Sequence, residues 1–231
     1  MRSGERHDFD DEARKLVRAI TRLTMSSCTR IHPRPLRQFA RLGLTAEGAS
    51  KGGMGGLYNP LDAMWRDART GGTIYVGNQQ AAQNAALLKE RGITHVVNCT
   101  DNMPLYHQGA FTYYRFNVSY WPSFGDLNEL ARFLQPLWDF VDGCLAKGEN
   151  VLVHCLAGAH RAGTTGIMCL MRYAGMSSLE AVPTAKRLRP VIDPIGRFPE
   201  LLRRYDAIRD KEGRPSRVAA AAPAPATVPQ S

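Results

Sequence analysis

Cys155 and Arg161 stand six residues apart with Gly158 midway between them, and side chains of these types at this spacing can bind and attack a phosphate ester. A cysteine thiolate is a strong nucleophile. The guanidinium of an arginine offers a planar fork of donors that matches two phosphate oxygens at once. The backbone N–H groups of a short loop, together with the arginine, lower the pKa of an enclosed thiol. Cys155 is therefore predicted to be a thiolate at neutral pH.

The segments on either side of this loop can position it. Residues 150–154 form an apolar strand-like run, and a helix-like segment that follows from Ala162 would direct its positive dipole end at the loop. A lone cysteine after a strand is more often a buried structural residue. The leading His154 and the spacing of Gly158 and Arg161 favour a phosphate-binding loop instead. The residues predicted to bind the phosphate are Leu156, Ala157, Gly158, Ala159, His160 and Arg161.

The pattern H-C-x-x-G-x-x-R of residues 154–161 resembles the signature of the cysteine-dependent protein tyrosine phosphatase superfamily, and within it the atypical dual-specificity phosphatases. This resemblance implies a protein phosphatase that hydrolyses phosphotyrosine, with phosphoserine and phosphothreonine as further substrates, through a phosphocysteine intermediate. It implies no metal and no cofactor, because the arginine and the loop dipoles stabilise the charge. Other segments that resemble the family are residues 73–78, 85–88, 92–99, 176–181 and 189–192.

The resemblance also implies a general acid, an aspartate that protonates the leaving oxygen and then activates water. In the segment Y-W-P-S-F-G-D-L, Ser123 occupies the position that the family's aspartate would take, and a serine hydroxyl is far too weak an acid. Asp126, 29 residues before Cys155, is the predicted acid and base. Two alternatives stay open. In the first, Asp126 is only the N-cap of the next helix, with Glu129 at a capping-box spacing. In the second, this loop supplies no acid.

A second departure from the family follows the arginine. The family has a serine or threonine there, whose hydroxyl stabilises the departing thiolate when the phosphocysteine is hydrolysed. This chain has Ala162, so the breakdown of the intermediate is predicted to be slow. Thr164 and Thr165 come shortly after, but their side chains are expected to point elsewhere on the helix.

Three more side chains could support the loop. His154 is predicted to order the loop through hydrogen bonds and to tune the thiolate. His160 either lines the rim of the pocket, adding positive charge at mildly acidic pH, or is an exposed loop residue. Cys99 is either a buried core cysteine or a partner that forms a disulfide with Cys155 under oxidation, as in some relatives.

Alternating strand-like and helix-like segments predict an α/β fold with a mostly parallel central sheet flanked by helices. Ligands of such sheets bind beyond the carboxyl ends of the strands, which is where Cys155 falls. The predicted strands are residues 73–76, 94–98, 113–117 and 150–154, and the predicted helices are residues 80–91, 126–147, 162–174, 178–187 and 198–209. The predicted organisation is a basic extension and Gly-rich linker (1–57), a single catalytic domain (58–212) and an Ala/Pro-rich disordered tail (213–231).

Composition restricts the class of protein further. The chain has 231 residues, of which 44% are hydrophobic, enough for one well-packed core. No apolar run is as long as a membrane-spanning helix requires. The five cysteines are irregularly spaced without a C-x-x-C pair, which argues against a disulfide framework and a zinc site. A reducing compartment, the cytoplasm or the nucleus, is the expected location.

Eight basic residues and no acidic one lie between residues 13 and 41, and they carry nearly the whole net charge of +9. This stretch could contact an anionic membrane or an acidic partner. It could also target an organelle, although the acids among residues 5–12 weaken that interpretation. The alternative is a solvated helix or a disordered arm. Nucleic acid is disfavoured, because only Phe39 could stack on bases.

Two other functions compete with catalysis by a phosphatase. One is a phosphatase-fold module that binds phosphoproteins but turns over poorly, which Ser123 and Ala162 favour. The other is a rhodanese-like sulfur transferase, which Arg161 and His154 disfavour. The loop contains no lysine, which disfavours multiply phosphorylated inositol lipids. A phosphoprotein is therefore the predicted substrate.

Overall fold

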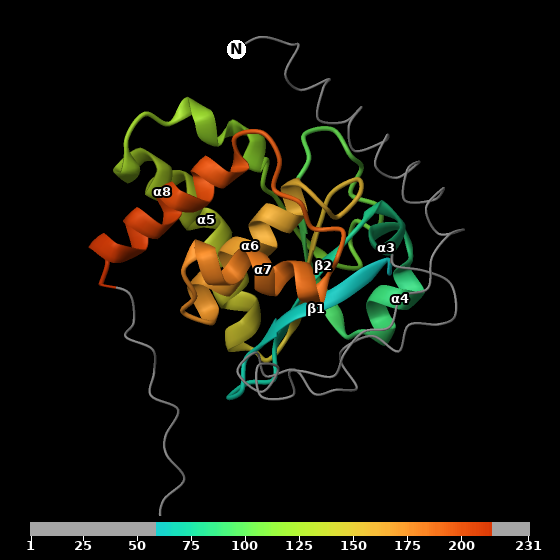
Figure 1. Cartoon of the computed structure of the whole chain (residues 1–231). Helices are drawn as coiled ribbons and strands as arrows, with labels where there is room; N and C mark the ends of the chain where they lie inside the picture. Colours follow the sequence, from blue (N-terminus) through green and yellow to red (C-terminus); the bar gives the residue numbers. More distant parts are fainter. Residues whose placement is uncertain (1–58, 214–231) are drawn as a thin grey trace, which may run out of the picture.

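A five-stranded sheet forms the centre of the computed structural model, which describes residues 59–213 (Figure 1). The strand order is β1-β2-β5-β3-β4. β1 pairs with β2 in the antiparallel sense, and all other neighbours pair in the parallel sense. The strands are β1 (Leu61–Arg66), β2 (Thr73–Gly77), β3 (Ile93–Asn98), β4 (Thr112–Arg115) and β5 (Asn150–His154).

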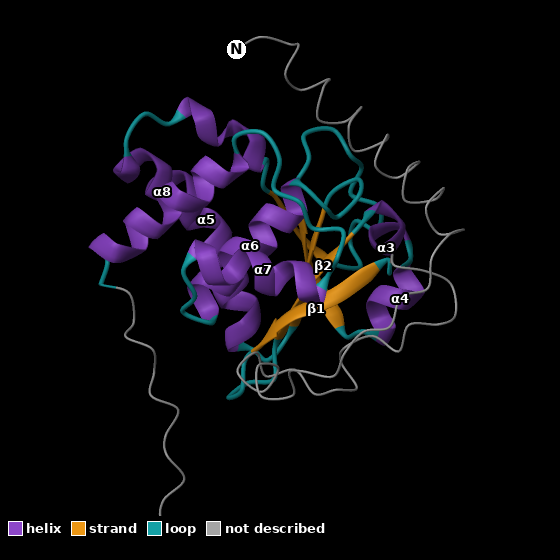
Figure 2. Cartoon of the chain, viewed as in Figure 1, coloured by secondary structure: helices purple, strands orange, loops and turns teal. Residues whose placement is uncertain are grey.

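Helices cover both faces of this sheet (Figure 2). Two short helices lie on one face, and four longer helices lie on the other. The short helices are α3 (Gln79–Gln83) and α4 (Ala85–Glu90). The longer ones are α5 (Leu127–Ala146), α6 (Arg161–Tyr173), α7 (Ser178–Leu188) and α8 (Phe198–Lys211), and a 3-10 helix spans Val118–Ser123. None of the helices within residues 59–213 is long and apolar enough to cross a bilayer.

The predicted α/β fold with a mostly parallel sheet is confirmed, but two local predictions are wrong. β1 was not expected, because its sequence L-D-A-M-W-R contains no β-branched residue, and its extended conformation comes with pairing to β2. The single helix expected over residues 80–91 is two helices. Asn84 ends α3, and its side-chain oxygen accepts a hydrogen bond from the N–H of Leu87 at 3.0 Å, which caps α4.

The strand and the helix that flank the predicted loop are both deeply buried. Val151 and Val153 of β5 pack into the larger core with the four long helices, while Leu152 packs on the other face. Every residue of α6 from Arg161 to Met171 is buried. The loop between β5 and α6 therefore has rigid supports on both sides.

Several predictions concern residues outside the described part of the chain. The basic stretch 13–41, the Gly-rich linker, and nearly all of the Ala/Pro-rich tail lie there. These stay predictions.

Candidate active site

The loop after β5 encloses the thiol of Cys155. This residue directly follows the last residue of β5, and only 2% of it is exposed. The backbone N–H of Gly158 donates a hydrogen bond to Cys155 Sγ at 3.3 Å. The α6 helix begins at Arg161, so its N-terminus lies at the end of the same loop. A thiol in this position receives backbone N–H groups and the positive end of a helix dipole, which favour an anion there.

Gly158 can only be a glycine in this loop. Its φ of +67° lies in the left-handed region, which side chains other than glycine rarely adopt. A Cβ at this position would also lie 2.5 Å from the carbonyl oxygen of Gly77 and 2.7 Å from Arg189 Nη2. The loop therefore turns tightly against the end of β2.

Arg189 supports the loop from beneath, and sequence reasoning gave it no role at the site. Its Nε donates to the carbonyl oxygen of Gly158 at 2.9 Å, and its Nη2 donates to that of Ala157 at 3.4 Å. Its Nη1 pairs with Asp62 Oδ2 at 2.6 Å in an ion pair whose side chains are 1% and 8% exposed. Arg189 follows α7 and Asp62 lies on β1, so no local sequence signal links either residue to the loop.

The loop residues predicted to bind phosphate lie together between β5 and α6. Ala157 and Ala159 are fully buried, and Leu156 packs against them. Arg161 is 8% exposed, and its carbonyl oxygen accepts a hydrogen bond from Thr165 Oγ1 at 3.0 Å. The loop thus follows the arrangement that the sequence predicted. Binding of phosphate by these residues is a prediction that the contacts do not test.

The two histidines beside the loop are both buried. Burial lowers the pKa of His154 to about 3, so this side chain is neutral at physiological pH and contributes no positive charge to the thiol. Its Nδ1 has no hydrogen-bond partner among residues 59–213. His160 donates from Nδ1 to the carbonyl oxygen of Asp193 at 2.6 Å and is 6% exposed. The alternative that His160 is an exposed loop residue is therefore wrong.

Cys99 is a buried core cysteine, as one of the two interpretations expected. Its thiol is fully buried and donates to Thr165 Oγ1 at 3.6 Å. Burial raises its pKa far above the ordinary value, and the nearby Cys155 adds to this effect, so Cys99 stays protonated. A disulfide between the two cysteines remains a prediction.

Ala162 is fully buried and belongs to the same hydrophobic core as Cys155. The hydroxyls of the next two threonines are both engaged in hydrogen bonds to backbone carbonyls one turn earlier. Thr164 Oγ1 donates to the carbonyl oxygen of His160 at 2.7 Å, and Thr165 Oγ1 donates back to Arg161 along the helix.

The loop expected to supply the acid begins with the 3-10 helix and ends at α5; we call residues 118–126 the 3-10 loop. Asp126 is the N-cap of α5, and its Oδ1 accepts hydrogen bonds from the N–H groups of Asn128 at 2.7 Å and Glu129 at 2.8 Å. These bonds, the one from Glu129 first, lower the pKa of Asp126. The carboxylate of Glu129 in turn accepts the N–H of Gly125 at 2.9 Å. Asp126 is thus the N-cap of α5, and whether it also acts as an acid stays a prediction.

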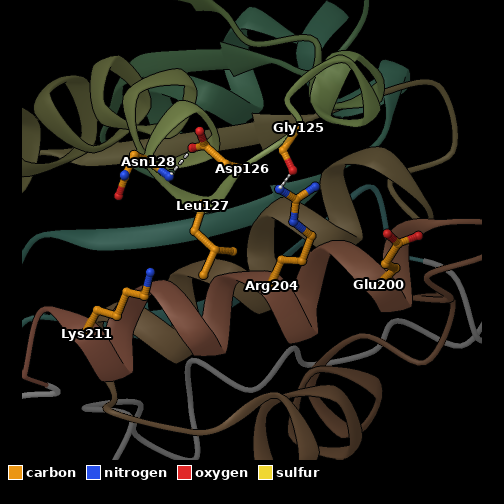
Figure 3. Close-up of a pocket in the computed structure, with 7 residues that line it drawn as sticks. All are labelled: Gly125, Asp126, Leu127, Asn128, Glu200, Arg204 and Lys211. Carbon is orange, nitrogen blue, oxygen red and sulfur yellow. Dashed lines mark hydrogen bonds between the residues drawn. The ribbon is translucent and has the colours of Figure 1, made fainter.

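Asp126 also lines a surface pocket of about 550 Å³ between the start of α5 and helix α8 (Figure 3). None of the residues lining this pocket belongs to the loop 155–161. They are Gly125, Asp126, Leu127, Asn128, Glu200, Arg204 and Lys211. Arg204 connects the two elements, because it donates to the carbonyl oxygens of Phe124 at 2.9 Å and Gly125 at 3.0 Å. Ser123, at the family's aspartate position, is exposed.

Comparison with known proteins agrees with this geometry. Residues 74–208, more than half of the chain, match the family described as "Dual specificity phosphatase, catalytic domain". Dual specificity protein phosphatase 14 of Bos taurus is 30% identical over 145 residues, which cover 63% of this chain and 66% of that protein. Slingshot homolog 3 of Mus musculus is 30% identical over 139 residues, which cover 58% of this chain and 20% of that protein. The chain thus spans less than two thirds of these relatives.

A solved mouse structure has the same fold. It is entitled a putative dual specificity phosphatase complexed with zinc tungstate, and it is 27% identical with a TM-score of 0.55. The likeness covers 71% of this chain and 96% of that one. With the signature loop wrapped around Cys155 and the match over residues 74–208, this chain belongs to the family of dual specificity phosphatase catalytic domains.

Proposed function

We propose that this protein is a cysteine-dependent protein phosphatase that hydrolyses phosphotyrosine and, as an additional activity, phosphoserine and phosphothreonine. The observation that carries the proposal is the hydrogen bond of 3.3 Å from Gly158 N–H to Cys155 Sγ, within the loop between β5 and α6. A loop that donates N–H groups toward a sulfur also presents them to a phosphoryl group bound at that sulfur. Family membership supports the same reaction.

The reaction proceeds in two steps. Cys155 Sγ attacks phosphorus, the bond from phosphorus to the leaving oxygen breaks, and the phosphocysteine forms. Water then attacks phosphorus, the P–S bond breaks, and inorganic phosphate leaves. Arg161 and the backbone N–H groups of the loop stabilise the negative charge in both steps. The proton for the leaving oxygen has to come from a side chain outside this loop.

A phosphoprotein is the proposed substrate, because dual specificity protein phosphatases are the relatives found. Location in the cytoplasm or nucleus follows from the need for a reduced thiol. The basic stretch 13–41 is proposed to contact an anionic membrane or an acidic partner through its charge.

The test is hydrolysis of para-nitrophenyl phosphate and of a phosphotyrosine peptide without added metal. Cys155→Ser should lower kcat by about 10⁴-fold or more, because the nucleophile is lost. Tungstate, an oxyanion shaped like phosphate, should inhibit competitively. Turnover that survives in Cys155→Ser would disprove the proposal.

A second function, binding of phosphoproteins with poor turnover, is favoured by Ala162, which leaves no hydroxyl after the arginine. This function predicts that the native chain binds a phosphotyrosine peptide and tungstate but releases no phosphate beyond one equivalent. Repeated turnover on the peptide excludes it.

A further inference from the structure

The proposed reaction needs a proton donor, and the 3-10 loop does not direct a suitable one at Cys155. Ser123 is exposed, and its hydroxyl is too weak an acid. The carboxylate of Asp126 caps α5, and the same hydrogen bonds lower its pKa, which disfavours the protonated form that an acid must have. It also lines the pocket beside α8, where no residue of the loop 155–161 is found.

Another carboxylate lies at the carboxyl end of the strand next to β5. β3 and β5 are parallel neighbours, with Asn98 in register with His154. The backbone N–H of Cys99 donates to the carbonyl oxygen of His154 at 2.8 Å. Asp101 is only two residues farther along, a span of about 7 Å for an extended chain. The segment that carries Asp101 thus leaves the sheet beside the segment that carries Cys155.

Charges at this edge of the sheet are close enough to affect one another. The pKa of Cys99 is raised by burial first, then further by Cys155, while Arg161 acts in the opposite direction. The end of β3 therefore lies within electrostatic range of both the nucleophile and the arginine. Asp101 lies three residues beyond this end.

The segment that carries Asp101 is fixed by side chains beneath it. Asn98 Oδ1 accepts hydrogen bonds from Thr100 N at 3.0 Å and from Thr100 Oγ1 at 2.7 Å. Arg115 on β4 donates to the carbonyl oxygens of Thr100 at 2.8 Å and Met103 at 2.9 Å. A catalytic carboxylate needs such a rigid support, because small displacements of a reacting group are costly.

The carboxylate itself is positioned by Asn117, which precedes the 3-10 loop, and by Tyr120 within it. Asn117 Nδ2 donates to Asp101 Oδ1, and Tyr120 Oη lies 3.4 Å from Asp101 Oδ2. Asn117 is fixed in turn, because its Oδ1 accepts the N–H of Ser119 at 3.1 Å. Asp101 is only half-buried, so part of the residue reaches solvent.

We propose that Asp101, rather than a residue of the 3-10 loop, is the general acid and base of this phosphatase. In the first step the Asp101 carboxyl gives its proton to the leaving oxygen as the bond from phosphorus to that oxygen breaks and the bond from phosphorus to Cys155 Sγ forms. In the second step the Asp101 carboxylate takes a proton from water as the water oxygen bonds to phosphorus and the P–S bond breaks. The inference rests on the proposed phosphatase function.

The experiment compares Asp101→Asn with Asp126→Asn on two substrates that differ in how much they need an acid. A phosphotyrosine peptide has a poor leaving group, whereas para-nitrophenyl phosphate has an activated one. Asp101→Asn should lower kcat/KM for the peptide by about 100-fold or more and for the activated ester by less than about tenfold. The alkaline limb of the pH profile on the peptide, which reports the acid, should disappear.

Asp126→Asn is the matched control. Asparagine is as good an N-cap as aspartate, so the helix keeps its cap while the carboxylate is lost. The ratio of the two kcat/KM values should equal that of the native chain. Asp101→Glu should restore part of the activity on the peptide, because it returns a carboxylate.

The outcomes separate this inference from the function on which it rests. If the native chain and all variants lack turnover on both substrates, the phosphatase function fails. If the native chain is active and Asp101→Asn lowers both substrates equally, Asp101 only positions other groups and the inference is overturned. A melting temperature unchanged in Asp101→Asn would show that the loss is not one of folding. A selective loss in Asp126→Asn would return the role to the 3-10 loop.

Discussion

The loop 155–161 and the 3-10 loop both connect a parallel strand to a long helix, yet they are stabilised to different degrees by buried contacts. The first is buried, contains a left-handed glycine, and rests on Arg189, which is paired with Asp62 out of contact with solvent. The second is more exposed: Ser123, Gly125 and Asp126 lie on the surface, although Val118 and Trp121 are buried in the core. Arg204 of α8 donates to two of its backbone carbonyls. The loop around Cys155 is thus held mainly by buried contacts, whereas the 3-10 loop combines two buried side chains with surface contacts. This difference predicts that the two loops respond unequally to matched substitutions.

The largest expected difference is in the stability lost on replacing Arg189, which supports the loop 155–161, and Arg204, which supports the 3-10 loop. Arg189→Met should lower the free energy of unfolding by about 3–5 kcal/mol, because it leaves the buried carboxylate of Asp62 uncompensated. Arg204→Met removes hydrogen bonds at a half-buried position and should cost about 1–2 kcal/mol. Urea unfolding of both variants measures the difference. Equal losses would contradict a deeper anchoring of the loop 155–161.

The two glycines of these loops provide the next comparison. Gly158→Ala forces a left-handed residue against Gly77 and should cost about 1–3 kcal/mol in stability. It should also lower kcat/KM about 100-fold, because the loop shifts relative to Cys155. Gly125→Ala meets only Glu129 Oε2, at 3.7 Å, and should leave stability nearly unchanged. Comparable losses in the two variants would show that backbone strain does not distinguish the loops.

A smaller effect, on the rate of turnover, is expected at Ala162, where the chain departs from the family directly after the loop 155–161. Ala162→Ser supplies the missing hydroxyl and should raise the steady-state rate a few-fold while reducing a pre-steady-state burst. Stopped-flow release of para-nitrophenol measures both. Ala174→Ser, at the other end of α6, is the control for an added hydroxyl. If Ala162→Ser changes neither the burst nor the steady-state rate, slow breakdown of the phosphocysteine is not limiting.

The smallest effect is expected at the end of the 3-10 loop. The pKa of Asp126 is lower in the folded chain than in the unfolded chain, so its stabilising effect is complete above the unfolded value of about 3.9. It is lost as the pH falls through the lower folded value. Asp126→Ala should therefore lower the melting temperature by a few degrees at pH 7, and this difference should shrink below about pH 4. A difference that is independent of pH would show that the charge of the cap contributes nothing.

Most of the fold could be predicted because its signals are local. Apolar runs and their periodicity predicted β2, β3, β5 and the long helices, and the order of these elements predicted a parallel sheet. β1 was not predicted, because its six residues include no β-branched residue, and it forms a strand by pairing with β2. The boundary between α3 and α4 at Asn84 was not predicted either, because a single side-chain cap divides an otherwise helical pattern.

The sequence by itself determined the loop of the proposed nucleophile, because Cys155, Gly158 and Arg161 lie in one continuous stretch of backbone. Only the tertiary structure decided what surrounds that stretch. It placed Arg189 under the loop from 31 residues away and Asp101 at the end of the adjacent strand. It also assigned Asp126 to a helix cap and buried His160. Contacts between distant segments depend on how the strands align in the sheet, and no local pattern of residues records that alignment.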